Sequence, residues 1–166
     1  MRYYDSQDGA EVFERDIMAA HPDTSFGIPF SPPERYQRIT EDVRPVPPAY
    51  HRVVPGALID SGSGRLHTWL VEPMSVAEVV QILTQAVQSL LDSTVQAHNY
   101  DGILSACTYA NSKNPTFSAE GQACIEWRDA VWSTCYQILG DVQSGERNVP
   151  SVSELMNELP ALNWPG

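Results

Sequence analysis

The distribution of proline constrains the fold of this chain more than any other feature of its sequence. Nine of the 13 prolines lie within residues 1–73, and seven of them fall between Pro22 and Pro48. Proline fixes φ and lacks a backbone N–H, so long helices and central strands are disfavoured there. The pattern predicts a β-rich N-terminal domain, residues 1–73, built of short strands, turns and extended segments. Residues 74–166 form a second domain with a different composition.

The N-terminal domain begins with a predicted hairpin. Tyr3-Tyr4 reads as a strand, Asp8-Gly9 as a tight turn, and Val12-Phe13 as the returning strand. A short helical turn follows over residues 15–20, and it ends at His21-Pro22 because the residue before a proline avoids the helical region.

A second hairpin is predicted at the end of the same domain. Residues 50–59 and 66–71 are rich in valine and leucine, and they flank the glycine-rich turn 60–64. The stretch between the two hairpins, about 27–49, contains six of the 13 prolines and has no regular pattern. It is therefore predicted to be an extended arm.

The second domain carries the signs of helices. Ser75-x-x-Glu78 has capping-box spacing, and the apolar residues after it recur every three or four positions, which predicts a helix to about His98. A shorter helix is expected over 101–110. A second long helix is expected from a cap at Ser118 to about Val142.

A final short helix is predicted after a second capping box, Ser151-x-x-Glu154. Two long helices joined by a short one favour an antiparallel helical module with small helices packed across it. The fold class predicted for the whole chain is therefore α+β.

Charge and cysteine content exclude several classes of function. The net charge is −11, with one lysine, which argues against nucleic-acid and anionic-membrane binding because both need a basic face. No run approaches the roughly 18 apolar residues of a membrane span. Cys107, Cys124 and Cys135 are too few for a disulfide framework and lack metal-ligand spacing, so we expect a soluble protein from a reducing compartment.

The sequence offers no motif for catalysis, cofactor binding or metal binding. It has no nucleophile elbow and no phosphate-binding glycine loop, so the chain is predicted not to be an enzyme. The competing class is a small hydrolase acting on cell-surface polymer. Such an enzyme would have to gather His51 or His67 with an acidic residue such as Asp60.

One aromatic cluster favours protein binding. Arg128, Trp132 and Tyr136 share a helix face at i, i+4 spacing, where the arginine can stack on the indole and expose an aromatic ridge. The alternative is that the helix lies between two layers and buries aromatics on both sides. The candidate partner-binding residues are those three together with three aromatic residues of the arm, Phe26, Phe30 and Tyr36.

Several segments resemble bacteriophage proteins. Residues 100–112 (YDGILSACTYANS), 117–123 (FSAEGQA), 127–132 (WRDAVW) and 150–160 (PSVSELMNELP) are similar to the C-terminal module of phage tail assembly chaperone-like proteins. In the first half Tyr3-Tyr4-Asp5, HPDTSF (21–26) and TWLVEP (68–73) look like the small N-terminal domain of tail-fibre-associated proteins. The resemblance covers most of the chain and is weakest over residues 38–66.

The resemblance implies a role in the phage tail through protein contacts, with no catalytic residue to carry over. The expected partner is a tail fibre, tailspike or baseplate protein, and the expected location is the virion tail. The alternative is an assembly chaperone that stays in the host cytoplasm and leaves before the virion is complete. Tail symmetry also favours a homo-oligomer.

Overall fold

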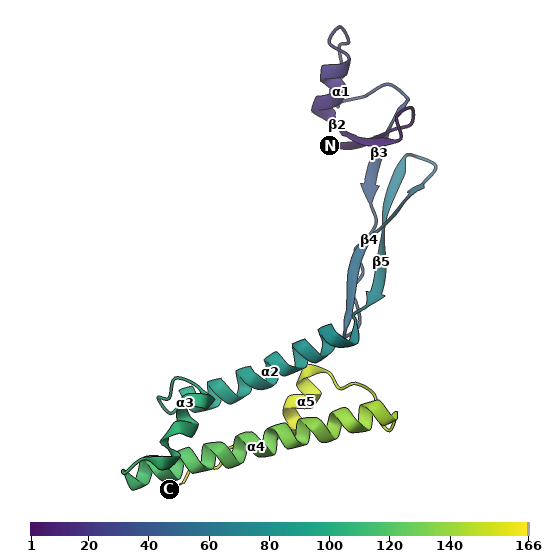
Figure 1. Ribbon diagram of the computed structural model, residues 1–166. Coiled ribbons are helices and arrows are strands. Elements are labelled where there is room, and N and C mark those ends of the chain that lie inside the picture. Colours follow the sequence, from purple (N-terminus) through teal and green to yellow (C-terminus); the bar gives the residue numbers. More distant parts are fainter. Residues whose placement is uncertain (166) are drawn as a thin grey trace. The chain divides into compact units, whose positions relative to one another are not determined.

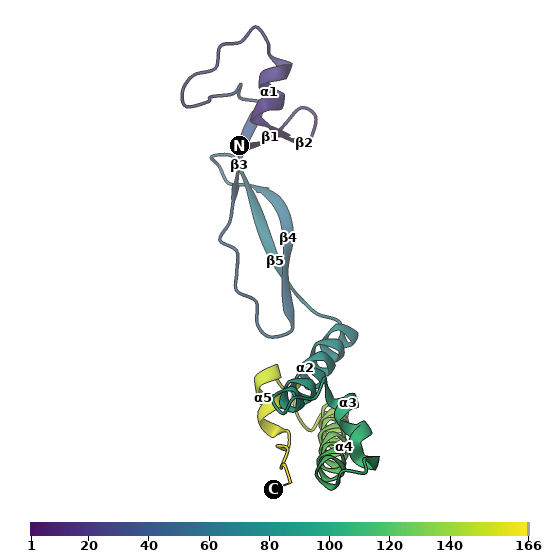
Figure 2. The same ribbon diagram turned by 90° about the vertical axis from the view of Figure 1, so that its left-hand side faces the viewer.

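The computed structural model describes residues 1–165 and has an α+β fold. The chain divides into two compact units, Met1–Met74 and the residues from Ser75 onward. This division falls beside Pro73, where the proline-rich half of the sequence ends. The strands of the first unit and the α-helices of the second are labelled in Figure 1 and Figure 2.

The first unit contains one five-stranded sheet in the order β2-β1-β3-β5-β4. Its elements are β1 (Arg2–Asp5), β2 (Ala10–Phe13), α1 (Glu14–Ala20), β3 (Tyr36–Glu41), β4 (His51–Asp60) and β5 (Arg65–Pro73). Both predicted hairpins are confirmed, because β1 pairs antiparallel with β2 and β4 pairs antiparallel with β5. The short helix after the first hairpin is confirmed as well.

Strand β3 corrects the predicted arm, which spanned residues 27–49. Tyr36–Glu41 lies in the middle of the sheet. Its first half pairs antiparallel with β1 and its second half pairs parallel with β5. The flanking prolines leave residues 34–44 free of proline, so this stretch is able to donate to both neighbours. An extended arm over this segment is therefore wrong, and β3 instead joins the two hairpins into one sheet.

The first hairpin, α1 and the first half of β3 enclose a small core, and we call this part the lobe. Tyr3, Ile17 and Tyr36 are buried in it. Phe26 and Phe30 pack against this core, and the Phe30 ring meets the Tyr3 ring edge-on at 5.7 Å between centroids. The segment before β3 is thus folded onto the lobe through its aromatic side chains.

The remainder of the first unit is the long β4–β5 hairpin, which we call the ribbon. No residue of β4 or β5 is buried. Residues 43–49 run beside the ribbon (Figure 2), from Asp42, whose N–H donates to the His67 carbonyl, to Tyr50, whose carbonyl accepts from Met74 N–H. The ribbon is therefore a two-stranded element without a hydrophobic core of its own.

The second unit is a helical module, as predicted. Its elements are α2 (Val76–Gln96), α3 (Ile103–Thr108), the 3₁₀ turn η1 (Tyr109–Asn111), α4 (Pro115–Ser144) and α5 (Val152–Glu158). The long helices α2 and α4 run antiparallel, and α3 with η1 connects them at one end (Figure 1). Both predicted capping boxes are confirmed, at Ser75 and at Ser151.

The start of α4 differs from the predicted cap at Ser118. The N-cap is Asn114, whose side chain accepts a hydrogen bond from Thr116 N–H, and Pro115 occupies the first helical position. Proline suits this position because the N–H that it lacks has no partner there. Ser118 lies inside the helix, and its hydroxyl donates to the Ala110 carbonyl at 2.8 Å.

One core holds the helices of this unit together. It is formed by Val87, Leu91, Val95, Ile103, Ala106, Cys124, Trp127, Val131, Ile138 and Leu155. The C-terminal segment closes the module, because the Trp127 indole donates to the Pro160 carbonyl at 2.7 Å and Trp164 stacks on His98 at 3.8 Å. The buried residues of α4 recur along the helix on one side, and that row faces this core.

Acidification is expected to weaken the packing of α5. Hydrogen bonds from Ser151 N–H to Glu154 and from the Arg147 guanidinium to Glu158 lower the pKa of both carboxyl groups. The stabilisation that the two ionised carboxylates contribute is present above the unfolded-state pKa of about 4.3. It is lost as the pH falls through the lower pKa values that these groups have in the folded state. In urea titrations from about pH 6 to about pH 3, the double variant Glu154→Gln/Glu158→Gln should lose less stability than wild type. An equal loss in both proteins would contradict this assignment.

Candidate functional site

A second row of large side chains runs along α4, beside the row that faces the core. Trp132, Tyr136 and Leu139 follow each other at i, i+4 and i+7, so they lie on one face of the helix. Tyr136 is 71% exposed and Leu139 is 37% exposed, whereas Trp132 is half-buried and packs against the core. We call these three residues the α4 ridge.

The N-terminal part of the same face is already covered by the chain itself. Gly121 lies against η1 so closely that a Cβ there would come within 2.2 Å of the Ala110 nitrogen. Ser118 bonds the Ala110 carbonyl, and Arg128 lies 3.7 Å from the Cys107 sulfur of α3. Helix α3 and η1 therefore cover the first half of this face. The α4 ridge lies on its second half, which no other described segment covers.

The three predicted binding residues of α4 have different surroundings. The Arg128 guanidinium contacts Asp129 at 2.8 Å and Cys107, and the hydrogen bond to Asp129 raises its pKa. The cation–π contacts of residues 1–165 do not include the predicted stacking of Arg128 on Trp132. Tyr136 projects to solvent as predicted, and Leu139, which the prediction omitted, extends the ridge by one turn.

The three candidates of the predicted arm are occupied by the lobe. Tyr36 is 6% exposed and belongs to the core, so its predicted place on a partner-facing arm is wrong. Phe26 and Phe30 are half-buried and stack at 4.8 Å between ring centroids. These aromatics pack against the core formed by Tyr3 of β1, Ile17 of α1 and Tyr36 of β3.

The ribbon is a second exposed surface, and sequence reasoning did not single it out as one. Ile59, Leu70 and Val71 are 45%, 52% and 41% exposed. The signal in the sequence was the presence of apolar residues at consecutive positions of both strands, which puts such side chains on both faces of a hairpin.

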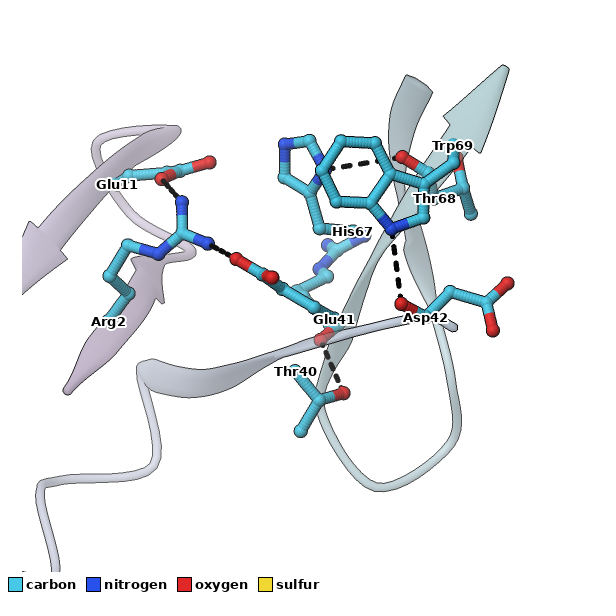
Figure 3. Close-up of polar contacts among 9 residues, drawn as sticks. Arg2, Glu11, Thr40, Glu41, Asp42, His67, Thr68 and Trp69 are labelled. Carbon is cyan, nitrogen blue, oxygen red and sulfur yellow. Dashed lines mark hydrogen bonds and ion pairs between the residues drawn. The ribbon is translucent and has the colours of Figure 1, made fainter. Parts of the chain in front are cut away.

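A polar joint fixes the base of the ribbon to the lobe (Figure 3). Arg2 of β1 contacts both Glu11 of β2 and Glu41 of β3. The Trp69 indole donates to the Asp42 carbonyl at 3.1 Å, and the Arg44 guanidinium lies 5.2 Å from the centre of the Trp69 ring. These contacts hold the residue after β3 and the start of segment 43–49 against β5.

Of the residues named for the alternative hydrolase, His67 and Asp60 are diagonal neighbours on one face of the ribbon, because Leu58 pairs with His67 and Asp60 with Arg65. His51 lies at the other end of the ribbon. His51 and Asp60 are the first and last residues of β4, so about 30 Å separates them in an extended strand. His67 lies beside the Thr68 carbonyl, and the Asp60 carboxylate accepts from Gly62 N–H. No catalytic motif in the sequence supports an active site formed by His51, His67 and Asp60.

The surroundings of the three cysteines favour the protonated thiol over the thiolate. Burial raises the pKa of Cys124 to about 11, and it also raises the pKa values of Cys107 and Cys135. Protonated thiols are poor nucleophiles and poor metal ligands. Within residues 1–165 no three His, Cys, Asp or Glu side chains gather as a metal site would require, and none of the described helices has the length and apolar character of a membrane span.

Comparison of the chain with protein-family models, curated proteins and solved structures gives no match.

Proposed function

We propose that this chain is a structural protein of a bacteriophage tail that binds a tail fibre, tailspike or baseplate protein. The observation that carries the proposal is the α4 ridge, because Tyr136 and Leu139 are exposed on a face that α3 and η1 cover elsewhere. Tryptophan and tyrosine supply large contact areas at a small entropic cost and are enriched in protein interfaces. The sequence resemblance supplies the identity of the partner.

The charge of the helical unit indicates which kind of partner surface would complement it. From Ser75 onward the chain has three basic and ten acidic residues. Two of the three basic side chains are already paired, Arg128 with Asp129 and Arg147 with Glu158. A partner surface with an apolar centre and a basic rim would complement the ridge and its surroundings.

Two measurements, one on purified phage particles and one on infected cells, test this proposal. Mass spectrometry of purified virions should find the intact chain in fixed stoichiometry with the tail proteins. Absence from virions, together with co-purification with the fibre protein from infected cells, would instead identify an assembly chaperone. Absence from both would overturn the proposal.

Tyr136→Ala is expected to weaken binding to the tail partner by about tenfold or more without unfolding the chain. Exposed side chains change stability by less than about 0.5 kcal/mol when replaced, so far-UV circular dichroism and the urea midpoint should stay unchanged. Binding is measured by titration with the fibre or baseplate protein encoded by the same phage. Gln137→Ala, exposed on another face of α4, is the control and should bind normally. Equal binding by both variants would exclude the ridge.

A further inference from the structure

The two faces of the ribbon are both apolar and differ from each other. The register pairs Val54 with Leu70 and Ile59 with Leu66, and cross-strand partners share a face. We call this the Leu70 face.

The opposite side of the ribbon is the Val71 face. It carries the pairs Val53 with Val71, Pro55 with Trp69, and Leu58 with His67. On this face Asp42 and Arg44 already contact the Trp69 ring, and Val53, Leu58 and Val71 lie beside that contact. Successive residues of a strand point to opposite sides, so Leu70 lies on one face of the ribbon and Val71 on the other. Every residue of β4 and β5 retains access to solvent, and a two-stranded hairpin alone is marginally stable in water.

The ribbon is also the least acidic part of the chain. Residues 51–73, which form the ribbon, carry two arginines and two acidic residues, whereas the rest of the sequence carries eight basic and 19 acidic residues. Two of the ribbon charges, Arg52 and Glu72, lie opposite each other across the strands. A strongly charged partner would find little to complement here. A second copy of the chain can approach the ribbon without the repulsion that the acidic remainder would create.

The outer edge of the ribbon is protected against strand pairing. The edge formed by β4 contains Pro55 and an irregularity in register between Pro55 and Leu58. On the other side β5 pairs with β3 only through Arg65–His67, and residues 43–49 run beside its remaining length (Figure 2). Proline and bulges are the devices by which edge strands avoid adding a further strand. Association is therefore directed to the two apolar faces and away from the edge.

We infer that the ribbon is a self-association element in which the Leu70 face of one copy packs on the Val71 face of the next. A contact between unlike faces repeats around a ring, and closure covers both faces of every ribbon. A two-fold dimer through like faces would leave the other apolar face in water. Ring closure through unlike faces requires at least three copies. This inference stands on the ribbon alone and does not require the proposed tail function.

The test uses the full chain in sedimentation velocity and light scattering. Wild type should have a mass at least three times the 18.4 kDa of one chain. Leu70→Glu and Val71→Glu each place a charge on one of the two faces. Because the contact needs both faces, each variant alone should be monomeric. Mixed together, the intact Val71 face of one variant meets the intact Leu70 face of the other, and we expect one-to-one dimers. Gln85→Glu, an exposed position in α2, controls for the added charge and should behave as wild type.

Other outcomes overturn the inference. A monomeric wild type shows that the ribbon does not self-associate, and variants that retain the wild-type mass place the contact elsewhere. A single variant that still dimerises shows contact between like faces and excludes the ring. If either glutamate variant loses its circular dichroism signal, Leu70→Thr and Val71→Thr replace the pair, because threonine favours strands. Tyr136→Ala should leave the mass unchanged, which separates this result from failure of the proposed function.

Discussion

Gly121→Ala is expected to destabilise the helical unit by about 3 kcal/mol, whereas Gly140→Ala in the same helix should stabilise it by about 0.5–1 kcal/mol. The added Cβ at Gly121 would lie 2.2 Å from the Ala110 nitrogen and 2.6 Å from the Tyr109 carbonyl carbon. Both are backbone atoms of η1, so no side-chain rotation relieves the clash. Nothing lies within 4 Å of the Cβ position at Gly140.

The clash at Gly121 should act on the contact between α3 and α4. Moving η1 away from α4 breaks the hydrogen bond between Ser118 and Ala110 and loosens the packing of Ile103 and Ala106 in the core. Urea denaturation followed by far-UV circular dichroism measures both variants. Similar stability changes at Gly121 and Gly140 would show that η1 yields without cost and that the close approach does not hold the helices together.

The elements that the sequence predicted are those specified by local signals. The helix that begins at Ser75 follows from its capping box and from an apolar repeat that no neighbour has to complete. The β4–β5 hairpin follows from two apolar runs around one turn. Asn114 differs from the predicted cap at Ser118, although the proline after it is a local signal for a helix start.

Strand β3 was not predicted because its pairing is non-local. It is buried at Tyr36 and Ile39, three residues apart, where a strand with one buried face would show a period of two. Because side chains alternate along a strand, these two residues face opposite sides of the sheet. The pairing changes from β1 to β5 between Arg38 and Ile39. A local pattern search cannot recover such a strand, and the prolines on either side favour an arm.

The candidate site was predictable only where exposure followed from helix geometry. The spacing of Trp132 and Tyr136 places them on one face, but the sequence does not tell that α3 and η1 cover its first half. Phe26 and Phe30 were assigned to a partner surface because the core against which they pack includes Tyr36 of β3, a strand that the sequence did not predict. Both errors arise from contacts between segments distant in sequence.

Asp5→Ala is expected to destabilise the lobe by about 3 kcal/mol, at the low end for breaking a buried ion pair. The Asp5 side chain is 2% exposed, and its carboxylate contacts the Arg35 guanidinium at 3.0 Å and accepts from Gln7 N–H at 2.9 Å. Alanine removes both contacts and leaves the Arg35 charge without its buried partner. The Arg35 side chain is 35% exposed, and water therefore limits the cost.

Two further variants separate charge from hydrogen bonding at this site. Asn at position 5 can still accept from Gln7 N–H, so Asp5→Asn should retain part of the stability that Asp5→Ala loses. Asp8→Ala, an exposed position in the same turn, should change stability by less than about 0.5 kcal/mol. Hydrogen exchange of the β1 and β3 amides measures the opening of the lobe directly, because both strands meet at Asp5 and Tyr36. If Asp5→Ala and Asp8→Ala exchange at the same rate, the ion pair does not hold the first hairpin to β3, and the aromatic core around Tyr3 must hold it instead.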